Sequence, residues 1–252
     1  MRILLALLLT CLGLSAQTNG LSTGQPLSTG MLLTSVAAAG GTTPWSPTNL
    51  ANCIGWWTAD SAQTNTSGLV TNLPDLWFNG WNFTNSDAGG RPRITNGVLN
   101  SVHSAMYFDG VDDVLYSTGT GTAQPFNLSM VIFLPTGEGK DHDIWRGPYV
   151  RWSSDSRWLL NSGAWLFGGT NTSTNAWFIL SVDVSGSSSI ISTNNVVMSG
   201  GNAGTGSATN CILMYYQKGY VAEIAFFSNT NSAANRTQVY SNWNQKYALG
   251  LP

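Results

Sequence analysis

Charged side chains are scarce in this chain. They make up only 9% of its 252 residues, against about a quarter in an average soluble domain. The 10 Lys and Arg residues stand against 12 Asp and Glu residues, which gives a formal net charge of -2. A protein that binds a phosphate backbone carries a basic patch on one face. This composition therefore argues against nucleic acid as a partner.

The residue types that carry catalysis are also few. The chain has two histidines, His103 and His142, and two glutamates, Glu138 and Glu223. No Gly-x-Ser-x-Gly nucleophile motif and no phosphate-binding glycine loop accompany them. The cysteines do not have the spacing of a zinc cluster. The sequence therefore predicts a protein that is not an enzyme.

Long hydrophobic runs are absent except at the N-terminus. Residues 1–16 read MRILLALLLTCLGLSA, with basic Arg2, an apolar run and the small residues Ser15 and Ala16 at the end. This layout is typical of a secretory signal peptide. The run is shorter than the roughly 20 apolar residues that a membrane-spanning helix needs. We therefore expect a protein that is secreted or held at the cell surface, with no membrane span.

Cysteine is nearly absent, with three in the chain. If Cys11 is removed with the signal peptide, Cys53 and Cys211 remain as an even pair in an oxidising compartment. This predicts one long-range disulfide. The alternative is two separate buried thiols, because cysteine is often buried without being bridged.

Two compositional regions follow the signal peptide. Residues 17–48 are rich in Gly, Ser, Thr and Pro and repeat LSTG, which predicts a flexible linker. Residues 49–252 contain short apolar or alternating runs, such as AMYFDG and WFILSVDV, separated by turn residues. Many closely spaced strands without intervening helices predict an all-β antiparallel sandwich in a single domain.

One helix is expected near the C-terminus. Ser232 can cap the segment AANRTQVYSNWNQKY, in which Val239, Trp243 and Tyr247 recur every four residues, and Gly250 follows as a stop. We expect this helix to close one end of the sandwich.

Four segments, taken in order, carry a resemblance to a known family. They are ANCIGWWTADS, LPDLWFNGWNFTNSDAGGRPRI, AMYFDGVDDVLY and KGYVAEIAFFSNTNSAANRTQVYSNWNQKYALG. Together they resemble the concanavalin A-like lectin/glucanase superfamily, in particular its laminin-G-like jelly-roll modules. The resemblance implies an antiparallel jelly-roll β-sandwich with a short C-terminal helix. It says less about the ligand, because one fold hosts many functions.

The third segment crowds three carboxylates, Asp109, Asp112 and Asp113, around Gly110. Asp109-Gly110 is a tight-turn pair, and the following carboxylates can bond nearby backbone amides. This favours a structural turn. The alternative is a calcium site, because some members of the superfamily bind calcium and carboxylates are the ligands that this cation prefers.

Glycoside hydrolases of this superfamily carry Glu-x-Asp-x-x-Glu on one strand, a pattern that is absent here. Asp112 and Asp113 are adjacent, so on a strand they would point to opposite faces. They could not act together on one glycosidic bond, which needs two carboxyl groups on either side of it. Hydrolysis is therefore disfavoured.

Charge and tryptophan gather in residues 138–165. Aromatic rings beside polar groups are typical of a carbohydrate site, and the candidate residues here are Trp145, Arg151, Trp152, Asp155, Arg157, Trp158 and Trp165. A second candidate is the loop with Trp77 and Trp81. For each tryptophan the alternative is core packing. Asp141, His142 and Asp143 could hold a metal or lie in a solvated loop.

The sequence thus favours a secreted, lectin-like module that binds carbohydrate, such as a cell-surface glycan, without catalysis. The alternative is a structural or adhesive scaffold with protein partners in a virion or cell-surface assembly, because jelly rolls also serve in capsids.

Overall fold

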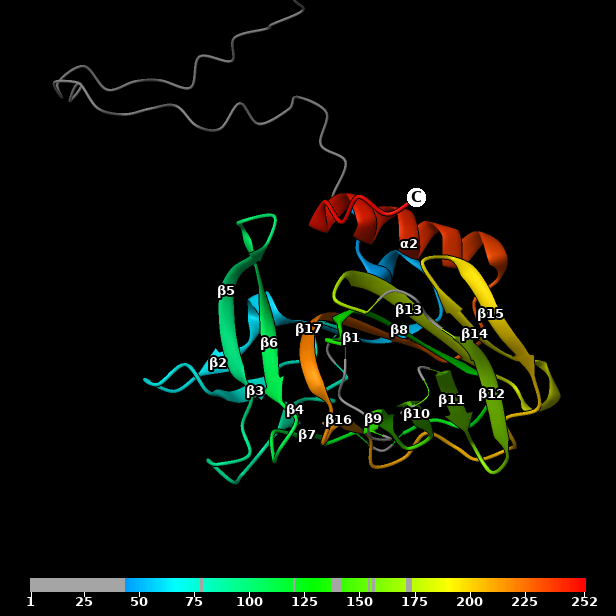
Figure 1. Ribbon diagram of the computed structural model, residues 1–252, viewed down its shortest axis with the longest axis horizontal. Coiled ribbons are helices and arrows are strands. Elements are labelled where there is room, and N and C mark those ends of the chain that lie inside the picture. Colours follow the sequence, from blue (N-terminus) through cyan, green and yellow to red (C-terminus); the bar gives the residue numbers. More distant parts are fainter. Residues whose placement is uncertain are drawn as a thin grey trace, which may run out of the picture. The chain divides into compact units, whose positions relative to one another are not determined.

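Two antiparallel sheets and one helix form three layers (Figure 1). The computed structural model describes residues 44–77, 79–119, 121–136, 142–153, 155, 157–170 and 174–252. The described part forms one unit that begins at Pro44, five residues before the position expected from the sequence. The predicted signal peptide and residues 17–43 of the predicted linker lie outside the described residues.

Sheet A has eight strands. Its order is β15 (Val196–Gly201), β14 (Ser189–Thr193), β13 (Trp177–Val184), β8 (Phe126–Phe133), β17 (Lys218–Phe227), β6 (His103–Asp109) and β5 (Arg93–Leu99), and β1 (Cys53–Thr58) also pairs with β17. Strand β17 reads as a nearly continuous apolar run because both of its faces are buried.

Sheet B has nine strands. Its order is β12 (Trp165–Thr170), β11 (Arg157–Asn161), β10 (Tyr149–Trp152), β9 (His142–Arg146), β16 (Ile212–Tyr215), β7 (Leu115–Ser117), β4 (Phe83–Thr84), β3 (Val70–Leu73) and β2 (Gln63–Thr64). The helical elements are η1 (Pro47–Asn49), η2 (Ala59–Ser61), η3 (Gly186–Ser188) and α2 (Ala233–Tyr247). This architecture confirms the predicted fold class. Among the described residues, no helix is long and apolar enough to cross a lipid bilayer.

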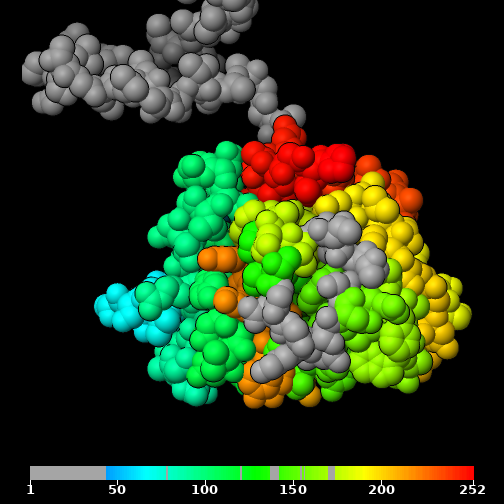
Figure 2. All heavy atoms as spheres, in the orientation of Figure 1, coloured from blue at the N-terminus to red at the C-terminus, as the bar shows by residue number. Residues whose placement is uncertain are grey.

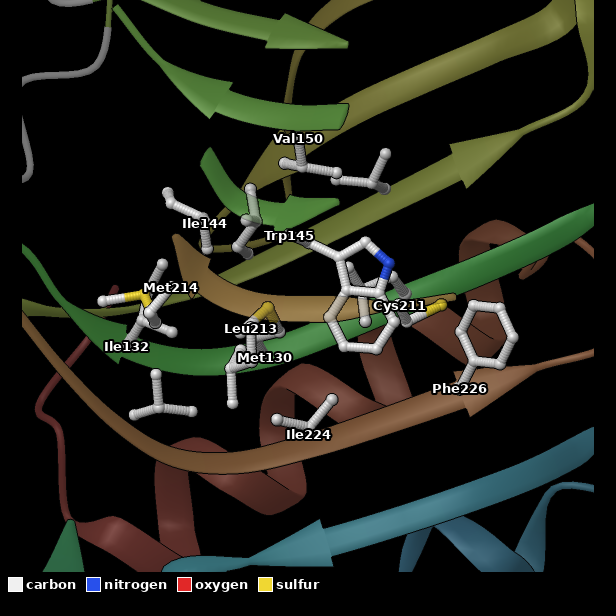
Figure 3. Close-up of a cluster of buried hydrophobic side chains, with 14 of the residues drawn as sticks. Met130, Ile132, Ile144, Trp145, Val150, Cys211, Leu213, Met214, Ile224 and Phe226 are labelled. Atoms are coloured by element: carbon white, nitrogen blue, oxygen red, sulfur yellow. The ribbon is translucent and has the colours of Figure 1, made fainter. Parts of the chain in front are cut away.

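The main core fills the space between the two sheets (Figure 3). Trp145 from sheet B lies at its centre, with its ring stacked 6.0 Å from the ring of Phe226 in sheet A. Trp158 and Phe178 also meet from opposite sheets, edge to face, with ring centroids 5.9 Å apart. Large aromatic rings therefore carry much of the packing between the sheets.

Helix α2 begins as predicted, because the Ser232 hydroxyl accepts a hydrogen bond from the Asn235 amide at 3.1 Å. It ends at Tyr247, where Ala248 adopts a left-handed conformation. The helix does not close an end of the sandwich. It lies over the outer face of sheet A, where Val239, Trp243 and Tyr247 are buried in a second apolar cluster. Figure 2 shows α2 in red between the green residues of β5 and β6 and the yellow residues of β14 and β15.

A buried carboxylate connects α2 to the sheet beneath it. Glu223 in β17 is 1% exposed. It accepts hydrogen bonds from Trp56 Nε1 at 2.6 Å, Lys246 Nζ at 2.7 Å and Tyr247 Oη at 2.5 Å. Burial and the charge of Glu223 raise the pKa of Tyr247 well above its ordinary value, so Tyr247 stays a proton donor. Glu223 is thus a structural residue.

The predicted disulfide is wrong, because Cys53 and Cys211 are both free and buried. Cys53 belongs to the cluster under α2, whereas Cys211 belongs to the core between the sheets, beside Trp145 (Figure 3). Sheet A separates the two clusters. The alternative drawn from the sequence, two separate buried thiols, is confirmed.

We expect both thiols to be inert in the folded protein. Burial raises the pKa of Cys53 and of Cys211 to about 12, and the thiolate is the reactive species. In the full chain with Cys11→Ser, a thiol reagent should titrate no cysteine under native conditions and both after unfolding without reductant. Titration of neither cysteine after unfolding would indicate a disulfide.

The variant Glu223→Gln should lower the free energy of unfolding by about 2 kcal/mol, because a buried charge-assisted network is lost. Urea denaturation measures this change. Lys246→Met is the companion variant. It should cost at least as much, because it leaves the buried Glu223 carboxylate, which is 1% exposed, without its cation. Equal stability of Glu223→Gln and the unmodified protein would contradict this structural role.

Candidate functional site: the outer face of sheet B

Exposed aromatic side chains gather on the outer face of sheet B, away from the core. They come from β7, β10, β12 and the end of β16, and they are Tyr116, Tyr149, Trp165, Phe167 and Tyr216, with Tyr215 half-buried. Rings of this size are usually buried in a globular protein. A group of exposed rings on one sheet face therefore indicates a binding surface.

Strand register brings these residues into rows across the sheet. Tyr149 pairs with Asn161, which pairs with Trp165. In the neighbouring row, Asp143 pairs with both Tyr215 and Arg151. Arg151 in turn lies opposite Leu159, and Leu159 opposite Phe167. We call the surface formed by Tyr116, Arg146, Tyr149, Arg151, Trp165, Phe167 and Tyr215 the aromatic face.

Asp143 organises the centre of the aromatic face. It is 2% exposed. One carboxylate oxygen accepts a hydrogen bond from Arg146 Nε, and the other accepts one from Arg151 Nε at 2.7 Å. The ion pair and hydrogen bond with Asp143 raise the pKa of Arg146, although burial, the largest single influence, acts in the opposite direction. Arg146 therefore stays charged, and Asp143 holds both guanidinium groups in place.

The two guanidinium groups also stack on the rings around them. Arg146 Cζ lies 3.6 Å from the ring centroid of Tyr215 and 5.5 Å from that of Tyr149. Arg151 Cζ lies 5.5 Å from the ring centroid of Trp165. Cation–π attraction of this kind stabilises the positions of both partners. The aromatic face is thus a preorganised surface of alternating rings and cations.

A β-bulge makes this arrangement possible. Val150 pairs with Trp145 and Arg151 pairs with Asp143, so Ile144 is an extra residue in β9. Ile144 and Trp145 both point into the core. In a regular strand Asp143 and Arg146 would point to opposite faces, whereas the bulge places both on the outer face.

The tryptophans predicted to bind a ligand divide into two groups. One group is buried in the core and consists of Trp145, Trp152 and Trp158. For these three, core packing, the alternative to ligand binding, is confirmed. Trp165 is 44% exposed and lies on the aromatic face together with Arg151. The strand YVRW explains the division, because Tyr149 and Arg151 alternate with the buried Val150 and Trp152.

The remaining candidates of this region lie apart from Asp143. Arg157 Nε pairs with Asp155 at 3.2 Å, and both side chains are more than half exposed. Asp141 lies outside the described residues. Asp143 is neither a loop residue nor free to hold a metal, because both of its oxygens accept hydrogen bonds from arginines.

The loop with Trp77 and Trp81 folds back over β1. The Trp81 carbonyl accepts a hydrogen bond from Trp57 Nε1 at 2.8 Å, and the Trp81 ring packs against the core. Asp75 holds the loop by accepting hydrogen bonds from the amides of Trp56 and Trp77. Trp77 remains 40% exposed. The loop therefore presents one ring and not two.

The Asp109–Asp113 turn has the structural contacts that the sequence predicts. Asp109 Oδ1 accepts a hydrogen bond from the Val111 amide at 2.7 Å, and Asp113 Oδ2 accepts one from the Asp109 amide at 2.9 Å. Gly110 has a φ of +81°, which favours glycine. The three carboxylates can bring oxygen atoms within 4.8 Å of one another. Hydrogen bonds between these carboxylates and backbone amides of the same turn thus stabilise the turn.

Two hollows of the described structure lie in different places. A small one of about 150 Å³ borders the aromatic face and is lined by Asp112, Val114, Tyr116, Tyr215 and Tyr216. A larger one of about 590 Å³ lies beside α2, where Glu223 and Lys246 face His103. The charged groups of the larger hollow already pair within the fold, since His103 Nδ1 contacts Asp60 at 2.6 Å. It therefore offers less to a ligand than the aromatic face does.

Sequence reasoning missed Tyr116, Arg146, Tyr149, Phe167 and Tyr215. The alternation around Arg151 was a signal for Tyr149. Phe167 follows Trp165 by two residues on β12, so alternation was a signal for it too. Arg146 reaches the face through the bulge in β9, and Tyr116 and Tyr215 reach it through pairing between strands distant in the chain, for which short motifs carry no signal.

The protein is thus a two-sheet antiparallel β-sandwich in which the outer face of sheet B carries exposed aromatic rings. No protein-family model and no curated protein matches the chain. Among solved structures, the chain is similar to Trypanosoma rangeli sialidase in complex with sialic acid, with 8% identity and a TM-score of 0.57 over 78% of this chain and 33% of the sialidase.

Two toxin domains are similar to the same degree. The botulinum neurotoxin serotype D ligand binding domain in complex with N-acetylneuraminic acid matches with 10% identity and a TM-score of 0.57, over 75% of this chain and 50% of that one. The receptor binding domain of the botulinum neurotoxin C/D mosaic serotype matches with 10% identity and a TM-score of 0.58, over 76% and 51%. The chain thus spans a third to a half of these proteins, and the likeness concerns the fold.

The turn should give the protein a pH-dependent stability. The pKa of Asp113 is raised from 3.8 to about 6, chiefly by burial, with the hydrogen bond from the Asp109 amide acting against this rise and the charges of Asp109 and Asp112 adding to it. Between these pH values the folded chain holds a proton that the unfolded chain releases, so stability falls as the pH rises from about 4 to 6.

The variant Asp113→Asn lacks this titration and keeps an oxygen acceptor for the Asp109 amide. Its unfolding free energy relative to the unmodified protein should therefore increase from pH 4 to pH 7. Urea denaturation at each pH in the presence of a chelator measures the difference, and parallel profiles of the two proteins would contradict the assignment.

Proposed function

We propose that this protein binds carbohydrate through the aromatic face and catalyses no reaction on it. The observation that carries the proposal is the exposed set of Tyr149, Trp165 and Phe167 around two fixed arginines. Ring faces stack on the apolar faces of sugars, and a few oriented polar groups bond their hydroxyls.

The fold supports this choice of surface. The outer face of sheet A is covered by α2 in the described part of the chain, and its apolar residues are buried there. Among the described residues, no helix covers the outer face of sheet B, and its rings are exposed. A sheet face with exposed rings at regular strand spacing suits an extended or branched oligosaccharide.

The comparisons point to the same class of ligand. The solved structures of the sialidase and of the serotype D toxin domain contain sialic acid. The sequence resemblance to concanavalin A-like lectins agrees with them. Because identity is only 8–10%, these likenesses support carbohydrate as a ligand class and say nothing about which residues bind it.

The absence of catalysis is part of the proposal and rests on the state of the carboxylates. Both oxygens of Asp143 accept hydrogen bonds from arginines, and Glu223 lies under α2. Hydrolysis by two carboxyl groups needs a free pair astride the bond. Release of reducing sugar from any bound glycan would contradict this part.

Secretion is proposed on the layout of residues 1–16. The N-terminus of the protein isolated from its source tests this. A mature chain that begins near Gln17 would support export, and one that keeps Met1 would contradict it.

The variant Trp165→Ala should weaken glycan binding by about 5- to 30-fold, because a stacked ring contributes on the order of 1–2 kcal/mol. A glycan array identifies a ligand, and titration calorimetry measures its affinity for each variant. Trp77→Ala is the matched control, because Trp77 is 40% exposed and lies outside the aromatic face. Its affinity should be unchanged.

The same titrations separate the other candidate sites. A loss of affinity in Trp77→Ala alone would move the site to the loop. We expect binding in the presence of a chelator. Binding that requires calcium would instead implicate the carboxylates of Asp109, Asp112 and Asp113, whose ligand atoms lie within 4.8 Å of one another.

A further inference from the structure

The aromatic face carries an excess of positive charge at its centre. Arg146 and Arg151 share the single carboxylate of Asp143. Two positive charges against one negative charge leave one positive charge. The neighbouring Arg157 adds nothing to it, since its pair with Asp155 is neutral. In a chain with so few charges, this excess is a specific feature.

The hydrogen-bonding capacity of both guanidinium groups is only partly used. Each arginine gives its Nε–H to Asp143. Within the described part of the chain, neither donates a hydrogen bond from an Nη nitrogen to another residue. Their side chains are 30% and 23% exposed. The Nη–H groups are therefore available to a ligand on this face.

The surroundings fix the direction of these donors. Asp143 is buried, and the ring of Tyr215 lies only 3.6 Å from Arg146 Cζ. A planar fork of donors held in this way matches the two oxygens of a carboxylate. A neutral sugar on the same surface would partly desolvate the cations without supplying an opposite charge, which costs free energy.

We infer that the aromatic face selects sugars that carry a carboxylate, of the hexuronic acid or sialic acid type, over neutral sugars. The carboxylate lies against Arg146 and Arg151, and the sugar rings stack on Tyr149 and Trp165. The negative group at the far end of the face, Asp112, borders the small hollow beside Tyr116 and Tyr215. It repels a second acidic group there, which fixes the direction of the ligand. This inference rests on the proposed function.

The test compares acidic glycans with neutral counterparts of the same shape. The probes are sialyllactose with its carboxamide, an oligogalacturonate with its methyl ester, and a sulfated oligosaccharide with its desulfated form. The full chain should bind the carboxylate form of one pair at least about tenfold more tightly than the neutral form. Its affinity should fall as salt rises from roughly 50 to 500 mM.

Arginine variants assign the effect to the face. Arg151→Gln leaves Asp143 paired with Arg146, so the fold is retained, and it should lose most of the preference for the acid. Arg151→Lys keeps the charge without the fork and should keep an intermediate preference. Arg157→Gln is the matched control on the adjacent strand, and its preference should match that of the unmodified protein.

The outcomes separate this inference from the proposed function. Equal binding of acid and neutral forms would overturn the inference while carbohydrate binding stands. A preference for the sulfated probe alone would also overturn it, in favour of sulfate recognition. A preference that Arg151→Gln leaves intact would place acid recognition elsewhere. If the unmodified protein bound no glycan at all, both the proposed function and this inference would fail.

Discussion

The attachment of α2 to sheet A determines which surface of this sandwich can bind a ligand. Glu223 holds the helix through Lys246 and Tyr247, while Trp56 of β1 donates to the same carboxylate, and the apolar side of the helix covers the sheet. The central strands β8, β13 and β17 of sheet A are buried on both faces, and most of their residues are apolar. The exposed rings therefore lie on sheet B, whose outer face has no helix over it in the described part of the chain. The position of the site follows from the position of the helix.

Buried carboxylates fix the positions of cationic side chains on both sheets. Glu223 and Asp183 connect α2 to sheet A, the latter through Arg236 at 2.9 Å, and Asp143 orients two arginines on sheet B. Each is almost fully buried and paired with a cation. Because an isolated buried charge is costly, each such carboxylate fixes the position of its partners. Few charges are present, and several of them position other groups.

The sequence predicts local features better than long-range ones. The alternation of strands, the Ser232 cap and the Asp109-Gly110 turn depend on neighbours in the chain, and the structure has all three. The disulfide was inferred from an even number of cysteines. That argument fails because the two lie on opposite faces of sheet A. The placement of α2 was wrong for a similar reason, since a helix pattern shows which side is apolar but not what that side meets.

The candidate site illustrates the same limit more sharply. The segment rich in charge and tryptophan does contribute to the aromatic face, but three of its tryptophans are core residues. The other rings on the face are Tyr149 of the same segment, Phe167 just beyond it, and Tyr116 and Tyr215 from strands distant in the chain. A bulge at Ile144 places Arg146 beside them. Short sequence motifs reveal neither which distant strands pair nor where a bulge falls. The low overall charge of the chain matters for this site. On a nearly uncharged surface, a single unbalanced cation dominates the local electrostatic potential and so attracts an anionic group to the aromatic face.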